Sequence, residues 1–150
     1  MTVELSDEVA IDPETALIAH LAPLHPHTDG SKQKVANYRE QGWPLPFILV
    51  RELPGQESVD ESDVDALMSV HTLVHKAAGR IALRDETERT HRRMLWIART
   101  LPTVALSNGR YAEFDYVRVV SRPHEEDYGD DQILRKVARY GIGLSYAKVQ

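Results

Sequence analysis

The stretch DVDALMSVHTLVH, Asp63 to His75, decides the fold that the sequence predicts. Alternate positions in a β-strand point to opposite faces of a sheet. Both alternating sets in this stretch contain apolar side chains, such as Met68 in one set and Leu67 in the other. Strands with apolar residues on both faces lie inside a sheet, covered on both sides. The stretch is therefore predicted to be a central strand.

Three further runs predict strands around it. LPFILVREL (45–53) is rich in apolar and β-branched residues and is followed by a Pro-Gly stop. FDYVRVVSRP (114–123) follows the turn signal SNGR and ends at a proline. VARYGIGLSYAKV (137–149) alternates large residues on one face with smaller ones, including Gly141 and Gly143, on the other. Small residues on that second face suit the close approach of a helix.

Two segments predict helices. In PETALIAHLAPL (13–24), Asp12 suits the N-cap and Pro13 the first helical position. A long helix is predicted to end at Leu101-Pro102, with DETERTHRRMLWIARTL as its clearest part and a start as early as Ala77. Its apolar stripe is expected to comprise Met94, Leu95, Ile97, Ala98 and Leu101.

The predicted order is α-β-β-α-β-β. Two amphipathic helices on one face of a four-stranded, mostly antiparallel mixed sheet give an α+β fold. The length of 150 residues predicts a single globular domain overall. Within it we expect an N-terminal extension with a short helix, 1–43, followed by the α+β domain, 44–150.

Composition excludes several classes of protein. The formal net charge of −5 argues against a nucleic-acid-binding domain, which is usually basic. Without cysteine the chain has no disulfide, no thiolate nucleophile and no cysteine-ligated zinc. The acidic N-terminal residues do not resemble a signal peptide, and no apolar run approaches the ~18 residues that span a bilayer. We therefore expect a soluble protein made in a cytoplasm, without a membrane partner.

YGDD, at Tyr128 to Asp131, matches the metal-binding turn of palm-type viral polymerases. In a two-metal site the carboxylates project from a rigid hairpin, and a second aspartate on another strand completes the site. Here HEED precedes the turn instead of an apolar strand, and no second aspartate-bearing strand is an obvious partner. YGDD is therefore interpreted as a Gly-containing turn that introduces the last strand.

No other motif selects a catalytic, metal or cofactor site. His71 and His75 have the i, i+4 spacing of two zinc ligands, but they lie in a predicted strand and lack the glutamate of HExxH. The acidic run 57–65 lacks the ligand spacing of a calcium loop, and GIG lacks the third glycine of a dinucleotide fingerprint. We therefore expect that the protein binds no metal or cofactor and is not an enzyme.

Charge is distributed in blocks of opposite sign. The N-terminal tail and the 57–65 and 125–131 segments are acidic, whereas the long helix and the start of the last strand are basic. An acidic loop of one molecule that meets the basic helix of another makes a heterologous contact, and such contacts close into rings. A mixed, solvated surface remains the alternative. A phosphate-binding face also remains open; it would use Arg80, Arg84, Arg89, Arg92, Arg93 and Arg99.

Five pieces in fixed order carry a resemblance to a known family: LPFILVREL, DVDALMSVHTLVH, ERTHRRMLWIARTLP, GRYAEFDYVRVVSRP and YGDDQILRKVARYGIGLSY. The last is the most specific, with an aromatic-Gly-Asp turn, a short polar spacer and VARYxIGLSY. Over roughly 44–148 the chain resembles the tail-terminator family of long, non-contractile-tailed phages (siphophages), in its actinobacterial branch.

The resemblance implies a role as well as a fold. The fold is a small α+β domain with a mixed sheet flanked by helices. The role is a hexameric ring that caps the completed tail tube, stops further addition of tube subunits and joins the tube to the head connector. Such a protein belongs to the virion, at the head–tail junction, and is made in the host cytoplasm. Its partners are other copies of itself, the major tail tube protein and the head–tail connector or stopper protein, while DNA only passes through the ring lumen.

Three alternatives stay open. One is another ring-forming connector component, such as a stopper or head-completion protein. The second is a metal-dependent hydrolase built on His71, His75 and nearby carboxylates, and the third is a nucleic-acid binder that uses the arginine-rich helix.

Subunit or partner contacts are expected where the charge blocks are exposed. Reversing Arg135 and Lys136 to glutamate is expected to weaken ring assembly. The candidate contact residues are Glu125, Glu126, Asp127, Tyr128, Asp130, Asp131, Arg135, Lys136, Arg89, Arg92 and Arg93.

Overall fold

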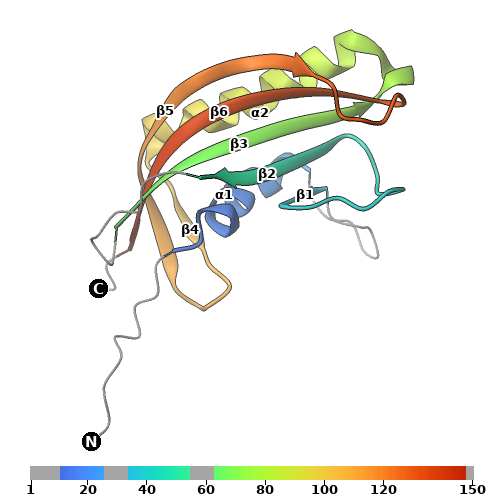
Figure 1. The fold of residues 1–150 in the computed structure, drawn as a ribbon. Helices are drawn as coiled ribbons and strands as arrows, with labels where there is room; N and C mark the ends of the chain where they lie inside the picture. The colour runs from blue at the N-terminus through green and yellow to red at the C-terminus, as the bar shows by residue number, and fades with distance from the viewer. Residues whose placement is uncertain (1–10, 26–33, 55–62, 148–150) are drawn as a thin grey trace, which may run out of the picture.

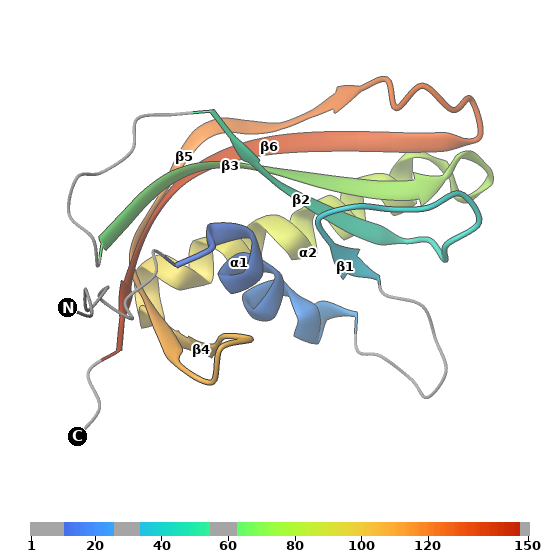
Figure 2. The ribbon, with the colours of Figure 1, turned by 60° about the horizontal axis from the view of Figure 1, so that its bottom comes forward.

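The computed structural model describes residues 11–25, 34–54 and 63–147. In this part of the chain a six-stranded sheet, with strand order β1-β2-β3-β6-β5-β4, curves into half a barrel (Figure 1). Both helices lie on its concave side (Figure 2). The strands are β1 Val35–Ala36, β2 Phe47–Leu53, β3 Asp63–His75, β4 Thr103–Ala105, β5 Tyr111–Glu126 and β6 Ile133–Tyr146. The helices are α1 Pro13–Leu21 and α2 Gly79–Thr100, with short 3₁₀ turns η1 Ala22–Leu24 and η2 Lys76–Ala78.

The predicted four-stranded sheet is wrong, although the α+β class is retained. The four long strands form where they were expected, but β1 and β4 join the two ends of the sheet. β1 pairs with β2 in parallel, and all other neighbours are antiparallel. Segments of two and three residues are too short to show the period-2 alternation that identifies a strand. The predictions for residues 1–10 of the acidic N-terminal tail and for acidic residues 57–62 lie outside the described residues.

The central position of β3 is confirmed. It pairs along its full length with β6 on one side and over Leu67–Leu73 with β2 on the other. One face of β3 contributes Met68 and Val70 to the main core, while Leu73 on the other face belongs to a second, smaller cluster. The apolar residues on both faces are therefore used.

α1 is fixed to the sheet by its first turn. The Asp12 carboxylate caps the helix by accepting a 3.1 Å hydrogen bond from the Glu14 amide. Glu14 in turn accepts hydrogen bonds from the Asn37 side chain, at 3.0 Å, and from the backbone amide of Glu52, at 2.7 Å. Leu17 is fully buried beneath the helix. The helix predicted at this place is confirmed.

α2 buries a different stripe from the expected one. Met94 and Ile97 are fully buried, as expected, but Leu95 and Leu101 are 40% and 46% exposed. The buried face is completed by Leu83 and by two threonines whose hydroxyls bond to carbonyls of the preceding turn. The helix ends at Leu101, which adopts the left-handed conformation (φ 41°) before Pro102. The exposed Leu95 becomes important for the surface described below.

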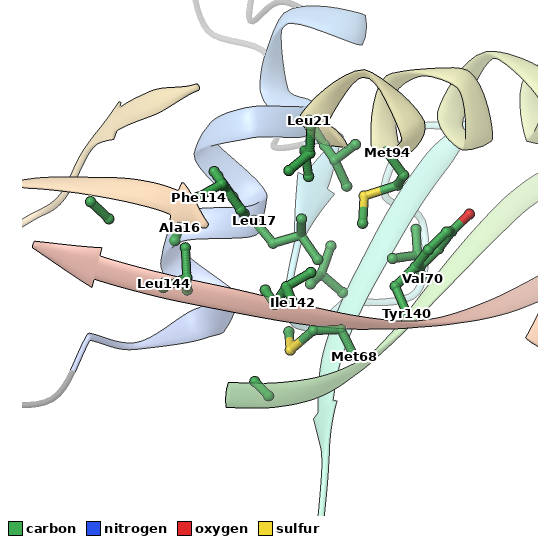
Figure 3. Packing of buried hydrophobic residues seen from close by; sticks show 14 of the residues in the cluster. Ala16, Leu17, Leu21, Met68, Val70, Met94, Phe114, Tyr140, Ile142 and Leu144 are labelled. Atoms are coloured by element: carbon green, nitrogen blue, oxygen red, sulfur yellow. The ribbon is translucent and has the colours of Figure 1, made fainter. Parts of the chain in front are cut away.

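The main core fills the space between the concave face of the sheet and the two helices (Figure 3). Its largest fully buried side chains come from both helices and four strands, and include Leu17, Leu21, Met68, Met94, Phe114 and Ile142. The second cluster lies on the convex face, where Phe47 and Leu73 pair across β2 and β3 and the half-buried Trp43 and Tyr128 pack against them. Burial of this apolar area is the main stabilising contribution.

The small residues of β6 receive side chains from β5 and not a helix. On the convex face Gly143 is paired with Tyr116 of β5 on one side and with Asp65 of β3 on the other. The Tyr116 ring lies across Gly143, where a Cβ atom would overlap it, and the Tyr116 hydroxyl donates to the Asp65 carboxylate. The glycine therefore lets one side chain connect three strands.

Candidate interaction surface along strand β5

The YGDD segment folds into a tight turn that uses the side chains of Asp130 and of the preceding Asp127. The Asp127 carboxylate accepts a 3.1 Å hydrogen bond from the Gly129 amide, and the Asp130 carboxylate accepts a 2.9 Å bond from the Gln132 amide. Gly129 has φ +88°, a conformation that favours glycine. Asp131 stays exposed. Within the described residues, no group of three or more His, Asp or Glu side chains is arranged to hold a metal ion.

Arg135 holds this turn against the convex face of the sheet. Its guanidinium donates to the Asp127 carbonyl and lies 5.6 Å from the centre of the Tyr128 ring. It also lies 3.3 Å from Nδ1 of His71. The predicted contact residues Asp127, Tyr128 and Arg135 are thus brought together, but their polar groups face one another within one chain.

His71, below this arginine, makes stability depend on pH. Burial, and then the positive charge of Arg135, lower the pKa of His71 to about 4, whereas an unfolded chain titrates near 6.5. The unfolded state therefore binds the proton first as pH falls. The contribution of neutral His71 to stability is complete above pH 6.5 and is lost between pH 6.5 and 4.

We expect His71→Gln to flatten this pH dependence. Between pH 7.5 and 4.5 the variant should lose about 1–2 kcal/mol less unfolding free energy than the parent, after allowance for partial solvent screening. Urea unfolding at the two pH values measures the difference. His75→Gln, at the exposed end of the same strand, controls for removal of a histidine, and an equal effect of both variants would contradict the prediction.

Arg89 and Arg93 lie at the junction of the two helices. Nε of Arg93 donates to the His20 carbonyl at 2.9 Å, and Nε2 of the buried His20 donates to the Arg93 carbonyl at 2.8 Å. Arg89 donates to the Leu24 carbonyl at 2.8 Å. Carbonyls at the end of a helix lack partners within the helix. These two arginines therefore hold the end of α1 and its 3₁₀ extension against α2.

The remaining predicted cations, Arg92 and Lys136, line a groove on the concave side. The groove has a volume of about 580 Å³ and runs between α2 and strands β5 and β6. Its walls are formed mainly by Arg84, Arg92, Leu95, Val119, Arg122 and Lys136. At one end Arg80 forms a 3.2 Å ion pair with Glu125, the acidic residue predicted as a contact. Glu126 points to the other face, where it lies 2.9 Å from Nε2 of His124.

The floor of the groove is neutral and its walls are basic. Nδ1 of His91 lies 2.6 Å from the hydroxyl of the buried Tyr140. Burial, and then the charge of Arg122, lower the pKa of His91, while burial raises the pKa of Tyr140 above its ordinary value. Both groups are therefore uncharged at neutral pH. Of the wall cations, Arg92 is paired with Glu88, but Arg122 and Lys136 have no hydrogen-bond or ion-pair partner in the described part of the chain.

Beside the groove, strand β5 has an open edge. β4 pairs only with Tyr111–Glu113, and the Phe114 amide donates to the Pro102 carbonyl. From Asp115 to Glu126, no described strand pairs with the outer side of β5. Four exposed apolar side chains lie on β5 and on α2, the helix across the groove: Val119 at 39% and Val120 at 49% on the strand, and Leu95 at 40% and Trp96 at 48% on the helix. We refer to the open edge (115–126), these four side chains and the groove as the β5 edge surface.

The sequence alone identifies the α2 side of this surface but not the β5 side. Arg84, His91 and Leu95 are spaced three to four residues apart, or multiples of that, so one face of a helix was recognisable in advance. Arg122 and Val119 join them from a strand more than 20 residues away. Which strand would lie at the sheet border, next to that helix face, depends on the strand order. Helix periodicity does not contain that information.

No model of a protein family matches the chain, and no curated protein matches it either. None of the helices in the described ranges is long and apolar enough to cross a membrane. The function is therefore inferred from the β5 edge surface and from the resemblance noted above.

Proposed function

We propose that this chain is a structural subunit that assembles into a ring, and that the ring is a phage tail terminator. The observation that carries the proposal is the open edge of β5, together with the exposed Val119 and Val120 of that strand and the exposed Leu95 and Trp96 of α2. An unpaired strand edge is a ready template for another chain. Exposed apolar patches rimmed by charge are typical of protein–protein contacts.

The two borders of the sheet support a head-to-tail arrangement. One border is the edge of β5, and the other is β2, which in the described part of the chain is covered by the two-residue β1 and by contacts with α1. These borders differ in sequence and in shape. A contact between one copy's β5 edge surface and a different part of the next copy is therefore heterologous, and repeated contacts of this kind form a ring when the rotation between neighbours closes.

Termination by such a ring requires no chemistry. One face of a hexameric ring binds the last ring of the tail tube, and its other face differs, so that tube subunits do not add to it. Complementary shape and charge determine which partner binds each face of the ring. The proposed partners are further copies of the chain, the major tail tube protein and the head–tail connector or stopper protein, with DNA passing through the lumen.

Assembly is tested with charges placed in the apolar part of the surface. We expect the wild-type protein to sediment as a ring, at about 100 kDa for six chains of 17.0 kDa. Replacing Trp96 and Val120 with glutamate should weaken association by at least about 30-fold, because a large aromatic side chain at an interface contributes on the order of 2 kcal/mol or more. Sedimentation velocity over a concentration series measures the change.

Tyr111→Glu is the matched control, because Tyr111 is similarly exposed but lies on the part of β5 already covered by β4. Imaging of particles that carry a tagged copy distinguishes a tail terminator from a stopper: the ring would contact the tube in the first case and the portal side in the second. A wild-type chain that stays monomeric in the presence of tail tubes would overturn the proposal.

A further inference from the structure

The β5 edge surface combines three features that together define the kind of occupant it fits. Its backbone edge offers amide and carbonyl groups along 115–126 that no described strand pairs with. Its groove has basic walls with two cations, Arg122 and Lys136, that lack a partner in the described chain. Leu95 and Val119 add an apolar part. An extended, acidic and partly apolar peptide satisfies all three features by adding a strand to the edge.

Nucleic acid fits this surface less well than a peptide does. The phosphate backbone would be satisfied by the basic walls alone, and single-stranded nucleic acid usually stacks its bases on aromatic side chains. Trp96 does not line the groove, and the ring of Tyr140 below the groove is buried, so no tryptophan, tyrosine or phenylalanine ring faces the basic walls among the described residues. The apolar wall and the open backbone edge would have no partner in such a complex.

The chain itself contains a segment with the required chemistry. Residues 2–9, TVELSDEV, carry three carboxylates, at Glu4, Asp7 and Glu8, and no lysine or arginine. In VEL the apolar Val3 and Leu5 flank Glu4. An extended backbone places Val3 and Leu5 on one side and Glu4 on the opposite side. The acidic run 57–61 has equal charge but contains a single apolar residue, Val59.

We infer that residues 2–9 of one copy bind as an extended segment along the β5 edge of a neighbouring copy, with their carboxylates against Arg84, Arg92, Arg122 and Lys136. This inference rests on the proposed ring and names the contact that closes it. Ile11 is buried in the main core and so fixes the point from which the segment leaves its own subunit. Ten extended residues reach about 33–36 Å from that point, which spans the width of a small domain.

The irregularity of β5 favours a short segment over a full-length strand. The register with β6 shifts between Phe114 and Tyr116, between Val119 and Ser121, and between Ser121 and His124. Such bulges bend a strand and interrupt its pairing, which is a common way to prevent indiscriminate sheet extension. A segment of a few residues pairs between bulges, where a long strand would lose its register.

Charge reversal and its rescue test the contact. Glu4→Lys with Asp7→Lys and Glu8→Lys should raise the dissociation constant of the assembly at least 30-fold, and Arg122→Glu with Lys136→Glu should do the same. Joining all five substitutions in one chain should restore association to within about fivefold of wild type, because two wall cations become carboxylates that attract the new lysines, while Arg84 and Arg92 keep Asp85 and Glu88 as partners. Glu57→Lys with Asp60→Lys and Glu61→Lys makes the same change in net charge and should leave association near wild type.

Far-UV circular dichroism confirms that each variant is folded. If the wild type forms rings and the triple reversal at 4, 7 and 8 assembles equally well, the segment is not the occupant, although the proposed function survives. An equal loss in the 57–61 control would also overturn the inference. A wild type that forms no ring fails the proposed function itself, and this result is seen before any variant is compared.

A photo-crosslink identifies the two ends of the contact. The full chain with p-benzoylphenylalanine in place of Leu5 is mixed in unlabelled and ¹⁵N-labelled form and irradiated. Crosslinks to residues 115–122 that join one light and one heavy chain are expected. Crosslinks confined to a single chain, or to another surface, overturn the inference, as does a DNA oligonucleotide that binds the groove and prevents the crosslink at low salt.

Discussion

Phe114→Ala is expected to lower the free energy of unfolding by about 3–5 kcal/mol, the range typical of a fully buried aromatic side chain replaced by alanine. Phe114 is 0% exposed and belongs to the main core (Figure 3). The centre of its ring lies 5.5 Å from the centre of the His20 ring. Phe114 sits at the start of the register shift in β5, and its amide bonds to the Pro102 carbonyl. The alanine variant would lose apolar burial and leave a cavity between α1 and the sheet.

The measurement is urea unfolding of the two proteins at one pH and one concentration. We expect the midpoint to fall while the slope with denaturant stays the same, because the surface exposed on unfolding hardly changes. Tyr111→Ala is the control on the same strand; Tyr111 is 56% exposed, so the expected loss is less than about 1 kcal/mol. Equal losses in the two variants would show that Phe114 does not have the packing role described.

Strand prediction succeeded where the chemical pattern was long and failed where it was short. β3 begins and ends at the predicted residues. Its thirteen residues carry apolar side chains on both faces, and this pattern correctly predicted a central position in the sheet. β1 and β4 contain two and three residues, and their pairing depends on neighbours distant in the sequence. The number of strands was therefore wrong, although the class of fold was right.

The role of small residues in β6 was predictable only in part. Alternation correctly placed Tyr140 and Gly141 on opposite faces. What covers the glycines was not predictable, because the covering side chains, Tyr116 and Arg118, come from β5 and lie across β6 only in the folded register. A pattern within one strand identifies the face but not the neighbour.

Arg135 and Lys136 illustrate why adjacent charges in a strand differ in meaning. Successive side chains point to opposite faces, so Arg135 holds the YGDD turn on the convex face and Lys136 lines the groove on the concave face. Reversing both together would mix a loss of stability with a loss of association. Lys136 alone, with Arg122, is the appropriate pair for testing assembly.

Arg92 and Arg93, which are neighbours in α2, are expected to differ in the same way: one substitution should mainly affect stability and the other mainly association. Arg93→Glu should lower the unfolding free energy by about 2–4 kcal/mol. It removes the half-buried hydrogen bond from Nε to the His20 carbonyl and places a negative charge at the C-terminal end of α1, where cations are favoured. Arg92 is mostly exposed, and its 3.4 Å pair with Glu88 contributes little to stability. Arg92→Glu should therefore cost less than about 1 kcal/mol.

Association should respond in the reverse order, because Arg92 lines the groove and Arg93 does not. We expect Arg92→Glu to weaken ring assembly about tenfold while its monomer unfolds almost like the parent. Arg93→Glu should unfold earlier, and its correctly folded fraction should associate normally at a temperature well below the transition. Urea unfolding at low protein concentration separates the two effects from each other, since bound neighbours stabilise the folded state. The contrary result is that both substitutions change stability and association in the same proportion. In that case the two arginines would not have separate roles, and it would be wrong to assign Arg93 to the contact between the helices and Arg92 to the β5 edge surface.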